Sequence, residues 1–418
     1  MADDLDHAPL PAEILADIER TGTADLAIGL ATIGTSQGIA DKAAAIRAGL
    51  DAHFSGHTAV IIHVDYGPSD EPSALLSQVL GERRVLRARS SHAVEALEGE
   101  GDHSETFHTV LAAGRALGAR VIVMLNSRLS SMTPDWIRGL AEPVLKEDYG
   151  LILPVYQRNR YEGTLTHTLV APLIRALFGR QLVHPLAEEF GCSAEAADFL
   201  LNQDVWSTDL GRHGCEFWIP TAIIEHGMPL GQAVLGQRAV AHPARPAPLG
   251  ATVGRVTGAL FALAERFEAT WLEVRGSEAV PTFGPSSPEP LETGFAVNTD
   301  GMLHGFRQGV RDLLPIWERI LAPDNLGDVL ALAEPGIGTF SFPDRLWARV
   351  VYDFLLAYRT RVVYQSHVAQ SLAPLYLGRA AALVLETRTR PAAAVTVAVE
   401  RLALMFEKQK SYLVDQWR

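Results

Sequence analysis

The feature that most constrains the fold is the apolar run Ala-Arg-Val-Ile-Val-Met-Leu at residues 119–125. A continuous run of β-branched and apolar residues is typical of a strand that is buried on both faces of a parallel sheet. Parallel neighbours need long crossover connections, usually helices. The sequence therefore predicts an α/β protein with a mostly parallel sheet.

Strands and helices are expected to alternate around this run. The pattern predicts strands at residues 24–33, 58–64, 84–88 and 150–156, and helices at 11–20, 39–50, 72–80, 103–117 and 134–144. Prolines in the segment 243–248 mark a boundary, after which helical periodicity dominates. We expect an N-terminal arm at residues 1–22, an α/β domain at 23–245 and a helical C-terminal domain at 250–418.

Composition limits the classes of partner. Apolar residues make up 48% of the chain and charged residues 20%, which is typical of a compact globular protein. The net charge of -13 disfavours binding to nucleic acid. Cys192 and Cys215 form neither a disulfide framework nor a zinc-ligand spacing. No apolar leader or run of 18 apolar residues is seen, so we expect a cytoplasmic protein without a membrane span.

A G-x-S-x-G motif lies between the first predicted strand and its helix, at residues 34–38. In that context Ser36 would be the nucleophile of an esterase. No Asp and His stand at recognisable positions for the other two roles. The alternative is a glycine-rich turn that passes closely over a ligand or a sheet edge, and we favour it.

In an open α/β sheet, ligands bind beyond the carboxyl ends of the strands. The segments that follow predicted strands are therefore the informative ones. They are residues 31–36, 63–65, 126–128 and 184–193.

Several blocks of the chain resemble the retaining GT-A glycosyltransferases that make glucosylglycerate, mannosylglycerate or glucosyl-3-phosphoglycerate. The blocks, at residues 120–137, 153–166, 184–191, 214–219, 239–242, 346–349 and 372–379, keep the family's order and spacing. The resemblance covers roughly residues 24–418. It implies a GT-A domain, which is a Rossmann-like nucleotide-diphospho-sugar transferase fold, followed by a helical C-terminal domain.

The resemblance also implies an activity. A hexose would move from a nucleotide-diphosphate sugar to a small hydroxy acid such as glycerate, with retention, as in the synthesis of compatible solutes. In the family a divalent metal, held by a D-x-D motif and a distal histidine, stabilises the charge that builds up on the leaving diphosphate. We also expect a homo-oligomer, in the form of a homodimer.

The sequence departs from the family at the metal site. Asn126-Ser127-Arg128 stands in place of D-x-D, and the family's G-K-G is Asp102-His103-Ser104. An asparagine is a poor ligand for Mg²⁺ or Mn²⁺, and an arginine repels a cation. We therefore expect fixed positive charge from Arg128 and His242 to replace the metal. No cofactor is assigned, and Mg²⁺ or Mn²⁺ with His242 as a ligand stays an alternative.

The resemblance assigns residues to three roles. Catalytic candidates are Arg128, Glu189 and Glu216; donor-binding candidates are Thr32, Gly34, Asp65, Asn126, Ser127, Arg128 and His242; acceptor-binding candidates are Arg158, Tyr161, Thr164, Thr166 and Glu189. Some of them have a structural alternative. Asp65 suits an Asx turn before Gly67, Thr164 or Thr166 suits a helix N-cap, and Glu216 suits a solvated surface charge.

Loss of both the D-x-D aspartates and the lysine supports a second hypothesis. The chain would then be a non-catalytic protein of GT-A fold that binds a sugar or nucleotide, or acts as a scaffold.

In the C-terminal part, Arg359, Arg361 and Arg379 are expected to be solvated charges, with a place at the mouth of the site as the alternative.

Overall fold

The computed structural model describes residues 10, 12–32, 38–67, 69–89, 103–126, 129–239, 249–286, 288–292, 297–334 and 340–418. By its contacts the chain forms two compact units. Unit 1 comprises Met1–Tyr156, Ala187–Pro246 and Pro281–Ser287, and unit 2 comprises Gln157–Leu186, Ala247–Val280 and Pro288–Arg418. The segment Gln157–Leu186 thus belongs with the C-terminal helices by contact, although it precedes residue 245 in the sequence.

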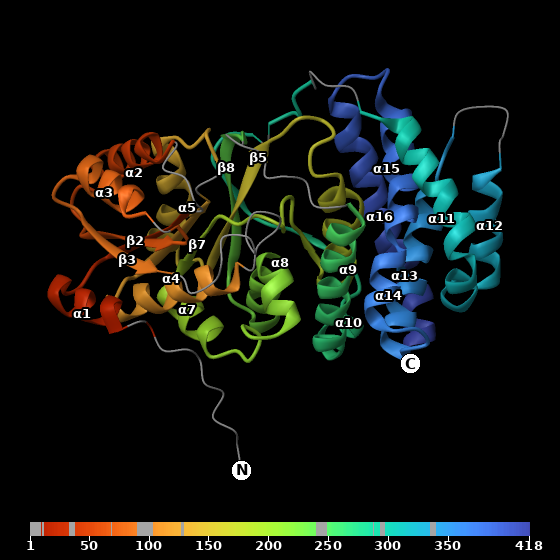
Figure 1. Cartoon of the computed structure of the whole chain (residues 1–418), viewed down its shortest axis with the longest axis horizontal. Coiled ribbons are helices and arrows are strands. Elements are labelled where there is room, and N and C mark those ends of the chain that lie inside the picture. Colours follow the sequence, from red (N-terminus) through yellow and green to blue (C-terminus); the bar gives the residue numbers. More distant parts are fainter. Residues whose placement is uncertain are drawn as a thin grey trace, which may run out of the picture. The chain divides into compact units, whose positions relative to one another are not determined.

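Unit 1 is an α/β sandwich (Figure 1). Its elements are α1 (Ala12–Thr21), β1 (Leu26–Thr32), α2 (Ile39–His53), β2 (Ala59–Asp65), α3 (Glu71–Leu80), β3 (Arg84–Arg89), α4 (Ser104–Ala116), β4 (Val121–Asn126), α5 (Pro134–Glu147), β5 (Leu151–Gln157), β7 (Phe190–Ser193), α7 (Ala194–Leu201), α8 (Asp209–His226), β8 (Leu230–Gln237) and β10 (Thr282–Phe283). The strands and helices that the sequence predicts up to residue 156 are all present.

The sheet of unit 1 has the strand order β10-β8-β5-β7-β4-β1-β2-β3. Strands β1 to β4 run parallel in their pairs, as the apolar run of β4 predicts. Strand β7 is antiparallel to both of its neighbours, β4 and β5. The prediction of an α/β class with a mostly parallel sheet is therefore confirmed.

Helices cover both faces of this sheet. Figure 1 shows α2, α3 and α5 on one face and α4 and α7 on the other. Alternate residues of the central strands belong to the core beneath α2 and α5, among them Leu26, Ile28, Val121 and Val123. Both faces of β4 are buried, which explains why its sequence shows no polar alternation.

Gly29 allows α4 to approach the opposite face of β1. A Cβ atom at this position would lie 2.6 Å from Cγ2 of Val110 on α4, well inside van der Waals contact. The absence of a side chain at Gly29 therefore sets the distance between β1 and α4.

Unit 2 is mainly helical. Its elements are the π-helix η2 (Thr166–Val170), α6 (Ala171–Phe178), β6 (Arg180–Gln181), α9 (Leu249–Arg266), α10 (Glu268–Glu273), β9 (Glu278–Ala279), α11 (Thr299–Ile320), α12 (Pro323–Ala333), α13 (Asp344–Thr360), α14 (Gln365–Ser371), α15 (Ala373–Thr387) and α16 (Ala393–Trp417). Helices α11, α13, α15 and α16 pack together (Figure 1).

Two side chains connect the early segment of unit 2 to its last helices. Trp347 of α13 is fully buried, and its Nε1 donates to the carbonyl of Thr168 at 2.6 Å. Arg175 of α6 is also buried, and it donates to Glu400 at 2.8 Å and to Glu407 at 2.6 Å, both on α16. A buried guanidinium needs such partners, because an unpaired charge out of water is costly.

One helical stretch among the described residues, Gln365–Thr387, is long and apolar enough to cross a membrane. It comprises α14 and α15, and 78% of its most apolar window is buried inside the protein. Core helices of globular proteins also meet these criteria, and such burial is typical of them.

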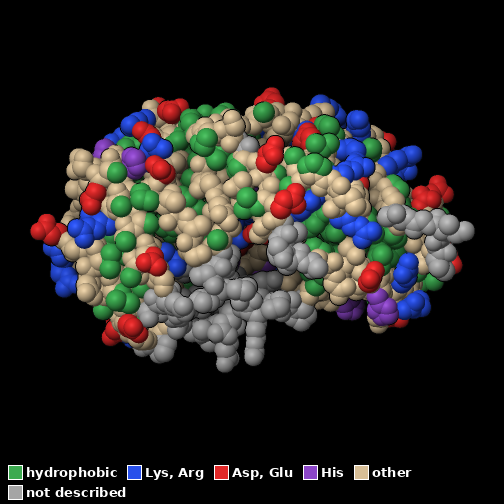
Figure 2. Space-filling model, turned by 90° about the horizontal axis from the view of Figure 1, so that it is seen from above, with side chains coloured by type: hydrophobic (Ala, Val, Ile, Leu, Met, Phe, Trp, Pro, Cys, Tyr) green, Lys and Arg blue, Asp and Glu red, His purple; other side chains and the backbone are tan. Residues whose placement is uncertain are grey.

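The face of the molecule in Figure 2 carries acidic and basic side chains that are interspersed.

The close packing at Gly29 gives a prediction. Replacement of Gly29 by alanine forces the new methyl group into Val110, so we expect the free energy of unfolding to fall by about 1–3 kcal/mol. Urea denaturation would measure it. Gly56→Ala is the control, because a Cβ there meets no atom within 4 Å. Equal stabilities of the two variants would contradict the packing argument.

Candidate functional site

A group of polar side chains lies at the carboxyl end of β4 in unit 1. Asn126, the last residue of β4, donates from Nδ2 to Oε2 of Glu188 at 2.6 Å. Strand β7 is antiparallel to β4 and pairs Phe190 with Met124, near the end of β4. The residues immediately before β7, Glu188 and Glu189, therefore lie at the sheet edge where ligands bind in α/β proteins.

Glu189 is the most buried carboxylate of this group, with 1% exposure. The hydroxyl of Tyr156, near the end of β5, donates to its Oε2 at 2.5 Å. Its Oε1 is buried and has no hydrogen-bond partner within the described part of the chain. Burial, together with the charge of Glu188, raises the pKa of Glu189, while Arg238 opposes the shift. The folded protein therefore favours the protonated form of the Glu189 carboxyl group more than water does.

Glu216 enters the same group from α8. It follows Gly214, where the helix is kinked, and 14% of its side chain is exposed. His103, which precedes α4, lies with Nε2 3.8 Å from Oε1 of Glu216 and 3.9 Å from Oε2 of Glu188. Burial raises the pKa of Glu216, and the nearby His103 lowers it. We call Asn126, His103, Glu188, Glu189 and Glu216 the carboxylate cluster.

The carboxylate cluster contains three of the residues that the sequence selected, Asn126, Glu189 and Glu216. Sequence reasoning did not select His103, Glu188, Tyr156 or Arg238 as site residues. A signal for His103 was available, since the sequence resemblance aligns Asp102-His103-Ser104 with the family's G-K-G. Glu188 and Tyr156 gave no such signal, because their proximity depends on the insertion of β7 between β4 and β5.

Asp65 and Thr32 lie at the ends of β2 and β1. The Asp65 side chain is fully buried and accepts from Nε of Arg87 at 3.1 Å and from the backbone N–H of Gly67 at 3.0 Å. The second bond is the Asx turn that the sequence left open. Thr32 Oγ1 lies 2.7 Å from Nε2 of His63. Burial lowers the pKa of His63 to about 4, so this ring is neutral at neutral pH.

Four of the candidate donor residues lie outside the described residues. They are Gly34, Ser127, Arg128 and His242. Ser36 of the G-x-S-x-G motif lies outside them as well. The roles of these residues stay predictions from the sequence.

The acceptor candidates other than Glu189 belong to unit 2. Tyr161 lies with its hydroxyl 3.2 Å from Thr387 Oγ1 on α15, and Thr164 lies with Oγ1 2.6 Å from the hydroxyl of Tyr376 on the same helix. Thr166 is buried at the start of η2. These contacts fix the turn before η2 against α15.

Arg158 lies near this turn. A Cβ on Gly163, which has φ 75°, would lie 2.8 Å from Nη1 of Arg158, so glycine is needed there for both space and backbone conformation. Burial lowers the pKa of His167 to about 4, and the charge of Arg158 adds to this shift. Arg158, which the sequence predicts to bind the carboxylate of the acceptor, therefore lies close to the neutral ring of His167.

The described side chains at the carboxyl end of β4 do not form a site for a divalent cation. Within the described ranges, no group of three or more His, Cys, Asp and Glu side chains is placed to hold a metal ion. Asn126 directs an N–H donor at Glu188, and the imidazole of His103 lies between the carboxylates of Glu188 and Glu216. This donor set does not fit Mg²⁺ or Mn²⁺, which prefer converging oxygen ligands.

No protein-family model and no curated protein sequence matches the chain. Among solved structures, it is similar to glucosyl-3-phosphoglycerate synthase from Mycobacterium tuberculosis in complex with phosphoglyceric acid, with 20% identity, 60% of this chain and 82% of that chain covered, and a TM-score of 0.43. It is also similar to mannosyl-3-phosphoglycerate synthase from Rubrobacter xylanophilus, with 18% identity, 68% and 84% covered, and a TM-score of 0.41. Both names belong to the type of enzyme that the sequence blocks resemble.

The environment of Glu189 predicts a pH effect on stability. Because its pKa is raised in the folded chain, the folded state binds this proton more tightly than the unfolded state, whose value is about 4.5. Stability from this group is therefore present at low pH and is lost as the pH rises above that value. We expect Glu189→Gln to remove this loss, so that between about pH 4.5 and pH 7.5 its free energy of unfolding falls less than that of the wild type.

Chemical denaturation across this pH range would measure the effect. Glu147→Gln is the matched control, because Glu147 is an exposed glutamate at the end of α5. Parallel pH profiles for the wild type and Glu189→Gln would show that Glu189 is ionised in the folded protein as readily as in the unfolded chain.

Proposed function

We propose that the protein is a glycosyltransferase that moves a hexose from a nucleotide-diphosphate sugar to a small hydroxy acid such as glycerate, with retention. The observation that carries the proposal is the meeting of Asn126, Glu189 and Glu216 at the carboxyl end of β4. The sequence resemblance assigns one of them to the donor and two to catalysis. A doubly covered α/β sheet binds its ligands at this edge.

The reaction exchanges one glycosidic bond for another. The bond between the anomeric carbon and the β-phosphate oxygen breaks, and the hydroxyl oxygen of the acid forms a new bond to the same face of that carbon. The hydroxyl proton leaves with the departing nucleoside diphosphate. The protein must therefore stabilise negative charge on the diphosphate and orient the acceptor hydroxyl.

Glu189 and Glu216 suit the orientation of hydroxyl groups. Burial raises the pKa of both carboxyls, which shifts them toward the protonated form. A protonated carboxyl both donates and accepts a hydrogen bond, as a sugar hydroxyl does. The free Oε1 of Glu189 would then have a partner in the complex.

The acceptor is proposed to be an unphosphorylated hydroxy acid. In the phosphoglycerate-using relatives that the blocks resemble, an arginine follows the glycine that is Gly163 here, and this chain has Thr164. The Thr164 hydroxyl bonds to Tyr376, so it adds no positive charge for a phosphate group. Arg158 is the proposed partner of the carboxylate.

Metal independence forms part of the proposal. Arg128 and His242 are proposed to supply the positive charge at the diphosphate, and Arg238, which follows β8, adds a cation near Glu189. An arginine clamp can stabilise phosphate oxygens without proton transfer.

A homodimer and a cytoplasmic location stay expectations from the sequence, to be tested by sedimentation and by fractionation.

Transfer assays test the activity directly. UDP-, GDP- and ADP-hexoses are incubated with glycerate in the presence and absence of EDTA, and the product's anomeric configuration is read by NMR. We expect transfer with retention that EDTA does not reduce. Glu189→Gln should lower the rate while Glu147→Gln should not. Loss of activity in EDTA would refute metal independence, and tight donor binding without transfer to any acceptor would favour the non-catalytic hypothesis.

Arg128→Ala tests the source of the positive charge. We expect it to abolish transfer or to weaken nucleoside-diphosphate binding by about 1.5–3 kcal/mol, the usual value of a charged hydrogen bond, with little change in melting temperature. Calorimetry would give the affinity. Arg138→Ala, an exposed arginine on α5, is the matched control. A well-folded Arg128→Ala protein with normal activity and affinity would exclude this residue from the mechanism.

A further inference from the structure

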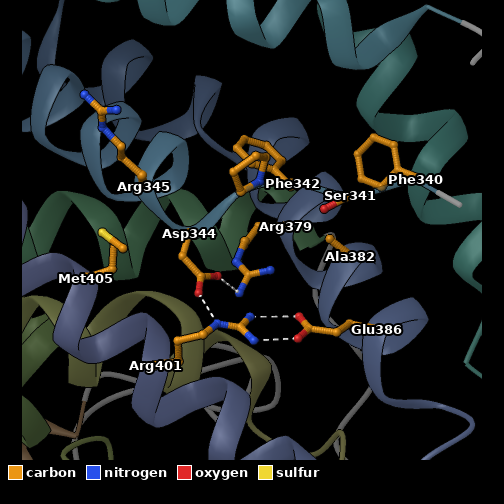
Figure 3. Close-up of a pocket in the computed structure, with 11 residues that line it drawn as sticks. Phe340, Ser341, Phe342, Asp344, Arg345, Arg379, Ala382, Glu386, Arg401 and Met405 are labelled. Carbon is orange, nitrogen blue, oxygen red and sulfur yellow. Dashed lines mark hydrogen bonds and ion pairs between the residues drawn. The ribbon is translucent and has the colours of Figure 1, made fainter.

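Unit 2 contains a cavity that no step of the proposed reaction uses. Its volume is about 550 Å³, and it lies among the start of α13, helices α15 and α16, and the segment 340–343 (Figure 3). Binding sites for small molecules have volumes of about 300–1,000 Å³. The cavity is therefore large enough for a ligand of one or two rings.

A chain of four alternating charges lines this cavity (Figure 3). Arg379 of α15 donates to Oδ1 of Asp344 at 2.8 Å, and Nε of Arg401 on α16 donates to Oδ2 of the same carboxylate at 2.6 Å. Arg401 also forms a bidentate pair with Glu386 at 2.6 and 2.9 Å. Two positive and two negative groups balance each other in this chain. Arg345 also lines the cavity and adds one positive charge, but its guanidinium points away from the chain (Figure 3).

Arg379 is the unusual member. The prediction that Arg379 is a solvated charge is wrong, because only 1% of its side chain is exposed. The physical reason is that α15 packs between other helices of unit 2, where Asp344 compensates the charge. Its Nε is nonetheless buried without a hydrogen-bond partner among the described residues. Because 1% of the side chain is exposed, this nitrogen is closed off from the cavity, and Arg401 is the arginine that a ligand can reach.

The opposite side of the cavity is apolar. Phe340 and Phe342 lie beside it, with Met405 of α16 and Ala382 of α15 completing the lining (Figure 3). The ring of Phe342 is held by Trp347 at a centroid distance of 5.7 Å, and that of Phe340 packs 5.6 Å from Phe306. The cavity therefore offers one accessible aromatic ring, that of Phe340, and hydrogen-bonding groups from the chain of charges.

We propose that this cavity binds a neutral polyhydroxylated molecule, such as a monosaccharide, a disaccharide or a small glycoside. A hydroxyl group both donates and accepts, so it can bond to the exposed Arg401 and to the remaining lone pairs of Asp344 and Glu386. The apolar C–H face of a sugar ring packs against Phe340, which is partly exposed, whereas Phe342 is buried behind it. An anion is disfavoured beside the four charges, since both arginines there are already paired with the carboxylates of Asp344 and Glu386.

The inference is independent of the proposed activity, because every residue that carries it lies in unit 2 and none belongs to the carboxylate cluster. The cavity would be a second sugar-binding site, separate from the carboxylate cluster. It needs neither a nucleotide nor a reaction at the first site.

Titration of the full-length chain tests the proposal. Glucose, mannose, maltose and trehalose are the neutral probes, and benzoate and inorganic phosphate are the anionic ones, with binding followed by calorimetry and saturation-transfer NMR. We expect at least one neutral sugar to bind and neither anion to displace it. Ser341→Trp, at an exposed position on the cavity rim, should weaken sugar binding at least about tenfold by filling the cavity.

Three further variants locate the binding. Ser366→Trp adds the same side chain at an exposed position on α14, away from the cavity, and should leave the affinity unchanged. Arg401→Gln, at a side chain that is 49% exposed, should weaken binding without disturbing the core. Glu189→Gln should leave it unchanged. The proposal is overturned if no neutral sugar binds, if Ser341→Trp and Arg401→Gln bind normally, if an anion displaces the sugar, or if Glu189→Gln removes binding.

Discussion

The insertion of β7 between β4 and β5 is the constraint on which the rest of unit 1 depends. Because β7 runs antiparallel to both neighbours, its first residue lies at the end where β4 and β5 finish. The two glutamates before it are thereby brought to Asn126 and Tyr156. A parallel strand in the same position would have placed them at the opposite edge of the sheet. The direction of one short strand thus decides whether unit 1 has a carboxylate cluster at all.

This arrangement has an energetic cost of the kind that is common at functional sites. Burial and mutual repulsion raise the pKa of Glu189, and the second oxygen of its carboxyl makes no hydrogen bond within the described residues. A sequence selected for stability alone would place apolar side chains here. Asp65 is a contrast, since Arg87 and a backbone N–H compensate its buried charge. Strained or incompletely satisfied polar groups collect at functional sites.

The sequence predicted the parallel part of unit 1 well, because β1, β2, β4 and β5 are apolar runs that follow a glycine, and β3 alternates arginines with apolar residues. The short strand β7 has no such signal, since its four residues include a glycine and a cysteine and its place depends on distant partners. The resemblance selected Glu189 and Glu216, but proximity of His103 and Tyr156 could not be read from spacing. Arg379 was misjudged for the same reason: its partner, Asp344, lies on another helix.

The two units are interleaved along the chain, which affects how the protein can fold during synthesis. The edge strand β10 pairs with β8 only after residues 282–283 have been made. Arg175 is translated early, yet both of its carboxylate partners are on α16, near the end of the chain. A nascent chain that stops short of α16 would carry an uncompensated arginine on a largely apolar helix. Unit 2 therefore completes its packing only after α16 has been synthesised.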